Sequence, residues 1–219
     1  MLNIDPRTIV LLASFLSLPL AIALLLLKRI YPPSIHGIRE WAISPLLFFL
    51  ATLMFGSFGT LPDMVSLLGG NTMVLSGALL LYFGSQRFFG VRPAHWPWMV
   101  ALAVVIGLTA WSVLEPARYA ERLIAVNAFL AGVLLKHAVF LFGRRHDNIF
   151  VRLTALALFM LAIITVVRAG TVAYGMEING VFDPATAQVV YLASLALGIL
   201  LITMGTVLMA SERMRREFE

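Results

Sequence analysis

Long apolar stretches, separated by short polar connections, make up almost the whole chain. Each stretch is close to the roughly 20 helical residues that cross a bilayer core about 30 Å thick. The pattern therefore predicts an all-α integral membrane protein, a bundle of seven transmembrane helices. The predicted helices are 8–27, 41–60, 64–82, 96–114, 123–142, 150–174 and 188–210. The first ends in Lys28 and Arg29 rather than in a small-residue cleavage site, so we expect it to be retained and not removed as a signal peptide.

The composition supports the same class. The 219 residues are 61% hydrophobic and 12% charged, with a mean hydropathy of +0.95, whereas about 25% of the residues in an average soluble domain are charged. Because nearly all residues belong to predicted spans or their connections, no soluble catalytic domain fits, and we predict that this chain is not an enzyme. One membrane domain, 1–210, is followed by the start of a cytoplasmic helix, 211–219.

Basic residues are distributed unequally between the two sides of the predicted membrane. Eleven lie in the first, third and fifth connections and the C-terminal segment: Lys28, Arg29, Arg39, Arg87, Arg92, Arg144, Arg145, Arg152, Arg213, Arg215 and Arg216. Three lie on the opposite side: Arg7, Arg118 and Arg122. Cytoplasmic connections are enriched in lysine and arginine, so the N-terminus is predicted outside and the C-terminus in the cytoplasm. Basic loops facing anionic membrane lipids account for the net charge of +5, and we expect no nucleic acid partner.

Tryptophan and small residues indicate how the helices contact lipid and one another. Trp41, Trp96, Trp98 and Trp111 lie near the ends of predicted spans. Tryptophan is enriched at membrane interfaces, so we predict that these side chains are interfacial anchors. The third predicted helix carries small residues at spacings of four and seven, namely Ser66, Gly70, Gly77 and Gly84. Such a stripe lets another helix approach closely, and we interpret it as a packing surface.

Arg168 is the charged residue that most needs an explanation, because it lies within the sixth predicted span. A charge at this depth costs at least a few kcal/mol and marks a candidate functional site. Polar residues of other spans are predicted at the same outer level: Asn71, Asn127, Tyr174, Gln188 and Tyr191. With Arg122, they predict an outward-facing pocket in which Arg168 binds an anionic or amphipathic small molecule. Alternatively, Arg168 pairs with Glu115 or Glu177, or extends to the outer surface.

Lys136 and His137 are a further pair of ionisable residues within a predicted span. We expect Lys136 to extend towards the cytoplasmic interface. For His137, an axial haem ligand and a proton-sensitive switch are both alternatives, but a single helical histidine without a partner at helical spacing favours an interhelical hydrogen bond. The chain has no cysteine, and its loop histidines lack metal-ligand spacing. We therefore predict no metal and no cofactor.

Known catalytic patterns are missing from the sequence. Its Gly-Ser and Ser-Gly pairs have no histidine at a matching depth, no phosphate-binding loop occurs, and the last span, 188–210, has no lysine for a retinal Schiff base. Transport is harder to exclude. A transporter or a lipid-binding membrane protein is the alternative to a sensor, although matched broken helices and an acidic residue at mid-depth are missing.

Several short patterns together resemble the N-terminal multi-helix membrane sensor regions that precede GGDEF diguanylate cyclase domains in bacteria. They are Trp41, the Leu-Pro-Asp run at 61–63, Asn71, the segment 80–90 ending in Gln-Arg-Phe-Phe-Gly, Arg168 and the segment 211–219. The resemblance implies a bacterial inner-membrane receptor whose cytoplasmic output domain makes cyclic di-GMP. No GGDEF sequence is present, so that output domain is expected beyond Glu219.

The C-terminal segment 211–219 has neither a glycine or asparagine cap nor a proline stop, so the last helix is predicted to continue out of the membrane. Val207, Ser211, Met214 and Phe218 follow spacings of four, three and four. This seam predicts a parallel coiled coil and hence a homodimer in a longer protein. The alternative is an amphipathic end that lies on anionic lipid through its arginines.

Overall fold

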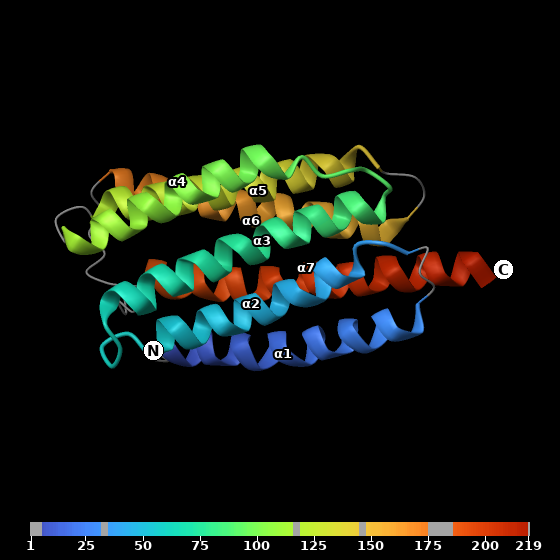
Figure 1. The fold of residues 1–219 in the computed structure, drawn as a ribbon, viewed down its shortest axis with the longest axis horizontal. Coiled ribbons are helices and arrows are strands. Elements are labelled where there is room, and N and C mark those ends of the chain that lie inside the picture. The colour runs from blue at the N-terminus through green and yellow to red at the C-terminus, as the bar shows by residue number, and fades with distance from the viewer. Residues whose placement is uncertain (1–5, 32–34, 116–118, 145–147, 175–185, 219) are drawn as a thin grey trace.

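The computed structural model describes residues 6–31, 35–115, 119–144, 148–174 and 186–218 (Figure 1). This part contains seven α-helices: α1 (Pro6–Ile30), α2 (Ile38–Gly56), α3 (Gly69–Phe88), α4 (His95–Leu114), α5 (Tyr119–Phe142), α6 (Ile149–Ala173) and α7 (Thr186–Phe218). A short π-helical segment, η1 (Met64–Leu68), leads directly into α3. Among the described residues, six helices, α2 to α7, are long and apolar enough to cross a membrane. The chain is a multi-pass helical membrane protein.

Every predicted helix corresponds to an observed one, and the largest differences lie at helix ends. Helix α2 ends at Gly56, four residues before the predicted end, because Ser57 caps it and Gly59 turns the chain with a φ of 87°. Helix α7 continues through Phe218, as the missing stop signals predict. Helix α1 has 25 residues, and several of its side chains lie outside the described part.

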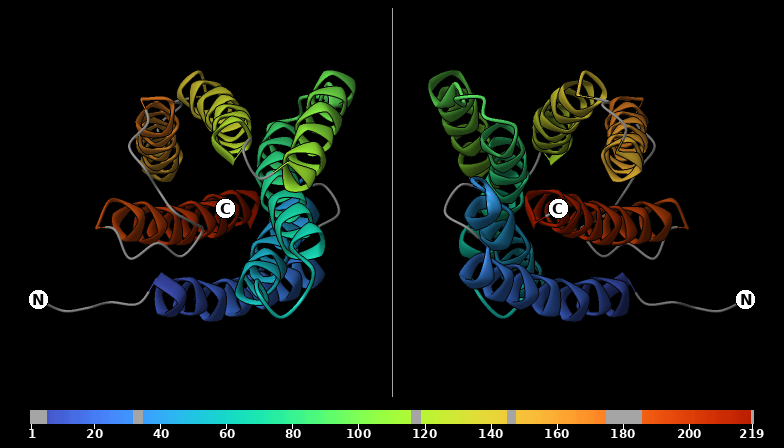
Figure 2. Two further views of the ribbon diagram at one scale, coloured as in Figure 1. Left: turned by 90° about the vertical axis from the view of Figure 1, so that its left-hand side faces the viewer. Right: turned by 90° about the vertical axis from the view of Figure 1, so that its right-hand side faces the viewer.

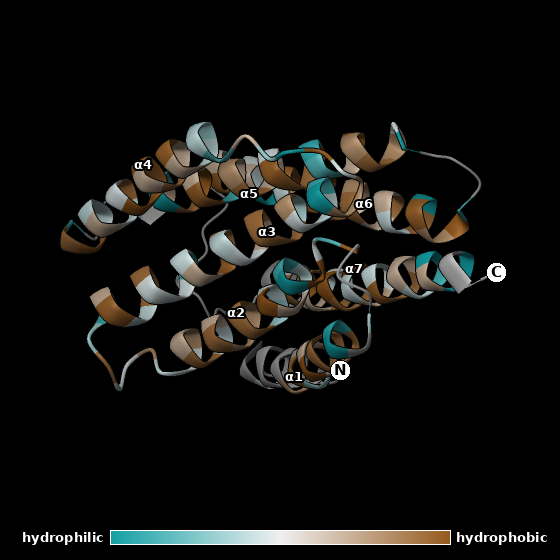
Figure 3. Ribbon diagram, turned by 45° about the vertical axis from the view of Figure 1, so that its right-hand side comes forward, coloured by the Kyte–Doolittle hydropathy of each residue, from teal (hydrophilic) through white to brown (hydrophobic). Residues whose placement is uncertain are grey.

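The helices form a ring of contacts in which the first meets the last (Figure 2). The contacts join α1 to α2, α2 to α3, α3 to α5, α5 to α6, α6 to α7 and α7 to α1. Helix α4 lies outside this ring against α3 and α5. Helix α1 begins at one end of the bundle and α7 ends at the other (Figure 1). Brown, apolar residues recur along the helices that are coloured in Figure 3.

The small-residue stripe of α3 packs against α2, which confirms the interpretation of its spacing. A Cβ atom added at Gly77 would lie 2.9 Å from the Phe48 ring, and one at Gly70 would lie 2.6 Å from the Phe55 ring. The closest approach is between backbones, because a Cβ at Gly37 would lie 2.2 Å from the carbonyl oxygen of Gly84. Glycine therefore allows α3 and the start of α2 to come together.

Trp41 is not an interfacial anchor, and this prediction was wrong. Its side chain is 0% exposed, and its Nε1 donates to the Leu81 carbonyl and to Ser85 Oγ, both at 3.2 Å. The ring fills the space left by Gly84, so packing between helices outweighs the interfacial preference of tryptophan. By contrast, Trp96 and Trp111 are 79% and 50% exposed.

The orientation of the bundle across the membrane can be tested with two single-cysteine variants, since the chain has no natural cysteine. Thr60 lies in the observed connection from α2 to η1 and Ala94 in that from α3 to α4; both are exposed, and these two connections are predicted on opposite sides. An impermeant thiol reagent is expected to label Thr60→Cys on intact cells, and Ala94→Cys only after the cells are opened. The reverse pattern would contradict the predicted topology.

Candidate functional site

Helices α6 and α7 approach each other closely at two glycines of α7. A Cβ at Gly205 would lie 2.0 Å from Thr154 Oγ1, and one at Gly198 would lie 2.9 Å from a methyl group of Leu161. These glycines are seven residues apart, about two helical turns, and so lie on one face of α7. The four residues of these contacts also line a groove between the two helices.

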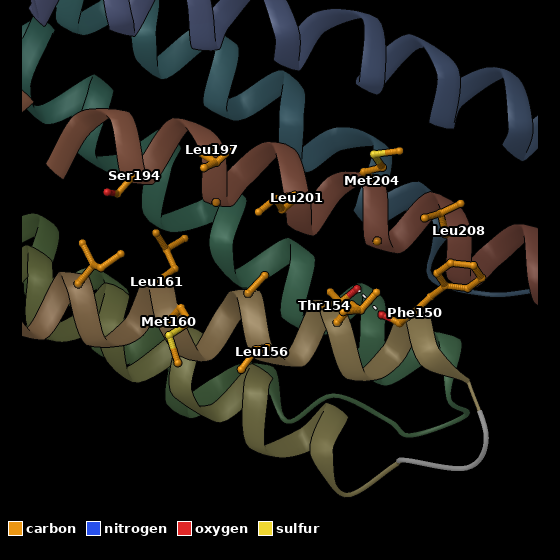
Figure 4. Close-up of a pocket in the computed structure, with 15 residues that line it drawn as sticks. Phe150, Thr154, Leu156, Met160, Leu161, Ser194, Leu197, Leu201, Met204 and Leu208 are labelled. Carbon is orange, nitrogen blue, oxygen red and sulfur yellow. Dashed lines mark hydrogen bonds between the residues drawn. The ribbon is translucent and has the colours of Figure 1, made fainter. Parts of the chain in front are cut away.

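This apolar groove has a volume of about 480 Å³ and is lined by α6 from Phe150 to Ile164 and by α7 from Ser194 to Leu208 (Figure 4). Its walls are mainly leucine and methionine side chains. Thr154 also lines it, but its hydroxyl donates to the Phe150 carbonyl of its own helix at 2.7 Å. The wall therefore offers apolar surface to whatever occupies the groove.

A second hollow, the polar pocket, adjoins the apolar groove. It also has a volume of about 480 Å³, and Ile164 and Ser194 line both spaces. Four of its eight lining residues are polar, namely Arg168, Thr171, Tyr191 and Ser194, and the Thr171 hydroxyl donates to the Arg168 carbonyl at 2.8 Å. Ligand-binding pockets commonly have volumes of about 300–1,000 Å³ and combine apolar walls with a few convergent polar groups. The boundary between α6 and α7, called the α6–α7 seam below, thus has a polar pocket with one charged residue at one end and an apolar groove along the rest.

Three of the predicted site residues meet at this polar end, each from a different helix. Arg168 of α6 is 5% exposed, and its Cζ lies 5.4 Å from the centre of the Tyr191 ring. Tyr191 of α7 donates its hydroxyl to Asn127 Oδ1 at 2.7 Å, and Asn127 of α5 in turn donates to the Leu123 carbonyl. A cation over an aromatic face gains about 0.5–2 kcal/mol, so Tyr191 holds the guanidinium of Arg168 and Asn127 holds Tyr191.

The other four predicted residues are placed differently. Asn71 donates to the Leu67 carbonyl one turn before it, and it lines neither hollow. Tyr174 is 89% exposed. Arg122 is 6% exposed but lines neither hollow, and the side chain of Gln188 lies outside the described residues. Asn71, Tyr174 and Arg122 therefore line neither hollow, and the prediction for Gln188 falls outside the described side chains.

Sequence reasoning missed Thr171, Ser194 and the two glycines of α7. The glycine spacing of seven in the last span is the same signal that identified the stripe on the third span. It would have predicted a close contact between α7 and a neighbouring helix, and hence a seam at which a groove can form.

His137 belongs to a second polar cluster at the contact of α2, α3 and α5. It is 1% exposed, and its Nε2 lies 2.7 Å from Ser85 Oγ, which also accepts the hydrogen bond from Trp41. The Tyr82 ring packs beside it, with the ring centres 5.6 Å apart. His137 is therefore an interhelical hydrogen-bonded residue, as predicted.

The C-terminal part of α7 is attached to the bundle at two points. Ser211 Oγ lies 3.3 Å from the Tyr31 hydroxyl at the end of α1. Arg213 donates to the Phe88 carbonyl at the end of α3, and its guanidinium lies 5.0 Å from the centre of the Phe88 ring. Phe88 in turn packs on Trp41, with the ring centres 4.7 Å apart. The end of α7 is thus connected to three other helices.

The predicted coiled-coil seam is largely occupied by contacts within this chain. Val207 and Met214 pack against the bundle core, and Ser211 contacts Tyr31. The side chain of Phe218 lies outside the described residues. A parallel coiled coil must therefore begin after Met214 or release these contacts.

The fold and its sites define a multi-span helical membrane protein. Comparison of the chain with protein-family models, with curated proteins and with solved structures found no match. The resemblance to GGDEF-associated sensor regions therefore stays a prediction from the sequence.

Proposed function

We propose that this chain is the sensing module of a membrane receptor. A small anionic or amphipathic ligand binds at Arg168 between α6 and α7, and α7 carries the signal to a cytoplasmic output domain. One observation carries this proposal: α7 contributes Tyr191 to the polar pocket and Ser211 and Arg213 to the attachment points at its other end. From Tyr191 to Arg213 the helix extends over 22 residues, about 33 Å by helical rise.

Occupation of the pocket changes the packing of α7 on α6. The two helices touch where glycines permit close approach, so a small rotation or shift of α7 changes which side chains meet. A ligand moves this equilibrium by its difference in affinity for the two arrangements. The shift reaches the end of α7, where Arg213 and Ser211 either keep or lose their contacts with α3 and α1.

The output domain belongs to the part of the proposal that rests on resemblance. A diguanylate cyclase must bring two nucleotide-bearing domains together, so control of dimer geometry by the emerging helix suits such an output. This chain holds the membrane module, and the cyclase activity is assigned to a domain that follows it.

The test is an insertion series in a fusion that places a diguanylate cyclase domain after Glu219. Insertions after Arg216 leave the contacts of Ser211 and Arg213 intact. Each added residue turns the following helix by about 100°, whereas seven residues restore nearly the same face. One or two inserted residues are expected to disrupt cyclase activity, and seven to recover most of it. A smooth decline with length, or no dependence, would show that the segment is a passive tether.

Transport or binding of a lipid-like molecule is the second candidate function, and the apolar groove favours it because it runs along the seam between two spans. In this case the ligand crosses or leaves the membrane instead of moving α7. Flux measured in proteoliposomes separates the two functions, since a sensor gives no flux above protein-free liposomes.

A further inference from the structure

We infer that the polar pocket and the apolar groove form one site for a long-chain fatty acid, with its carboxylate at Arg168 and its chain between α6 and α7. This inference rests on the proposed function in that it names the class of ligand for the same site. The choice of a fatty acid follows from two features: the positive charge of Arg168 complements a carboxylate, and the apolar groove complements a hydrocarbon chain.

The charged end suits a carboxylate. The guanidinium of Arg168 is planar and offers donors in a fork that matches a carboxylate in bidentate geometry. The Tyr191 ring faces this guanidinium at 5.4 Å, and the hydrogen bond from Tyr191 to Asn127 fixes the ring. The site is therefore ordered before a ligand arrives, which lowers the cost of binding.

The apolar length suits one hydrocarbon chain. From Ile164 to Phe150 the groove follows 14 residues of α6, about 21 Å by helical rise. Its lining side chains are apolar apart from Thr154 and Ser194, and the Thr154 hydroxyl is bonded to its own helix. The close contacts of Gly198 with Leu161 and of Gly205 with Thr154 join the two helices where they line the groove, so an alkyl chain lies along the helices instead of passing between them.

Depth in the membrane favours a single-chain acid over a phospholipid. Arg168 lies five residues before Ala173, the end of α6, which is about 7.5 Å along the helix. A phospholipid headgroup stays at the interface, and each of its chains ends near the midplane, about 15 Å deep. A fatty acid has no glycerol or second chain, so its carboxylate can descend to Arg168 while its chain follows the groove past the midplane.

The test uses a palmitate analogue with a photoreactive diazirine near the end of its chain. The purified protein is placed in phosphatidylcholine nanodiscs, labelled by light and digested, and the labelled peptides are identified by mass spectrometry. Label is expected in 150–161 of α6 and 197–208 of α7. Unlabelled palmitate should compete, whereas hexadecanol, with the same chain length but no charge, should compete at least tenfold more weakly.

Two pairs of variants separate the charged end from the apolar length. Arg168→Gln is expected to weaken labelling about tenfold to a hundredfold, while Arg152→Gln, an exposed arginine on the same helix, leaves it unchanged. Leu201→Trp fills the groove and should reduce labelling about tenfold while Arg168 stays in place. Its matched control is Leu108→Trp on α4, because the two leucines are 48% and 43% exposed.

Three results would overturn the inference. They are label spread equally over α4 and the α6–α7 seam, equal competition by hexadecanol, and stronger competition by phosphatidylglycerol than by palmitate, which would assign the site to a lipid headgroup.

The outcome also separates this inference from the proposed function. If Arg168→Gln silences a fused output domain but no label maps to the seam, the fatty acid is wrong and the sensor stands. If palmitate binds as expected but does not change the activity of the fused output domain, the binding site is supported and the sensor function is contradicted.

Discussion

Arg168→Ala is expected to remove the response of a fused output domain, with its activity falling to the level of a ligand-free state. The substitution removes the only charge that lines either hollow in the described part of the chain. Arg168→Lys should restore the response in part, since an ammonium group keeps the charge but lacks the planar fork. The measurement is cyclase activity of the fusion protein in membranes with and without added palmitate.

Two substitutions of Tyr191 show how Arg168 is held. Tyr191→Phe keeps the ring under the guanidinium but removes the donor to Asn127, and Tyr191→Leu removes both. We expect a moderate loss of response for the first and a loss close to that of Arg168→Ala for the second.

If Arg168→Ala leaves response, ligand binding and thermal stability unchanged, the polar pocket is not a functional site.

Gly37→Ala is expected to destabilise the protein more than the same change at Gly59 or Gly90, the other described glycines with a positive φ. Gly37 has a φ of 90°, which costs an alanine about 1–2 kcal/mol. Its new Cβ would also lie 2.2 Å from the Gly84 carbonyl oxygen, a backbone atom that cannot rotate away. Overpacking of this kind adds about 1–3 kcal/mol. Thermal unfolding in detergent should therefore show a clear drop in Tm.

The chain contains matched controls for this experiment. Gly59 and Gly90 have φ angles of 87° and 74°, and a Cβ at either would meet nothing within 4 Å. Their alanine variants report the cost of the backbone conformation alone. The difference between Gly37→Ala and these two isolates the close approach of α2 and α3. Equal Tm values for all three would show that this contact does not limit stability.

The hydrophobic pattern predicted the seven α-helices of the described residues, because each long apolar run has one low-energy arrangement in a bilayer. It did not predict how the helices associate. Helix α3 contacts α5 directly and α4 lies outside, although α4 is as apolar as its neighbours. Lipid is as apolar as a leucine side chain, so apolar surface does not say which helix faces the interior. Glycine spacing carried more of that information, as Gly77 against Phe48 shows.

The site was predicted in part for a similar reason. Depth along a helix follows from residue number, so the common level of Arg168, Asn127 and Tyr191 was readable from sequence. The direction of each side chain around its helix was not, and Asn71 and Tyr174 therefore appeared in the same set. The Ser85–His137 contact was also hidden, because it joins side chains 52 residues apart on helices that are not consecutive.

The contact between α1 and α7 sets an order for the assembly of the protein during synthesis. Tyr31 and Ser211 are separated by 180 residues, and a ribosome adds about 5–20 residues per second, so α1 waits roughly 9–36 s for its partner. During that time the face of α1 that α7 will contact must be covered by lipid or by the insertion machinery. Helix α7 is the last of the seven to enter and docks on α1 and α6 together. The α6–α7 seam, which we propose responds to a ligand, is therefore also one of the last helix contacts to form during synthesis.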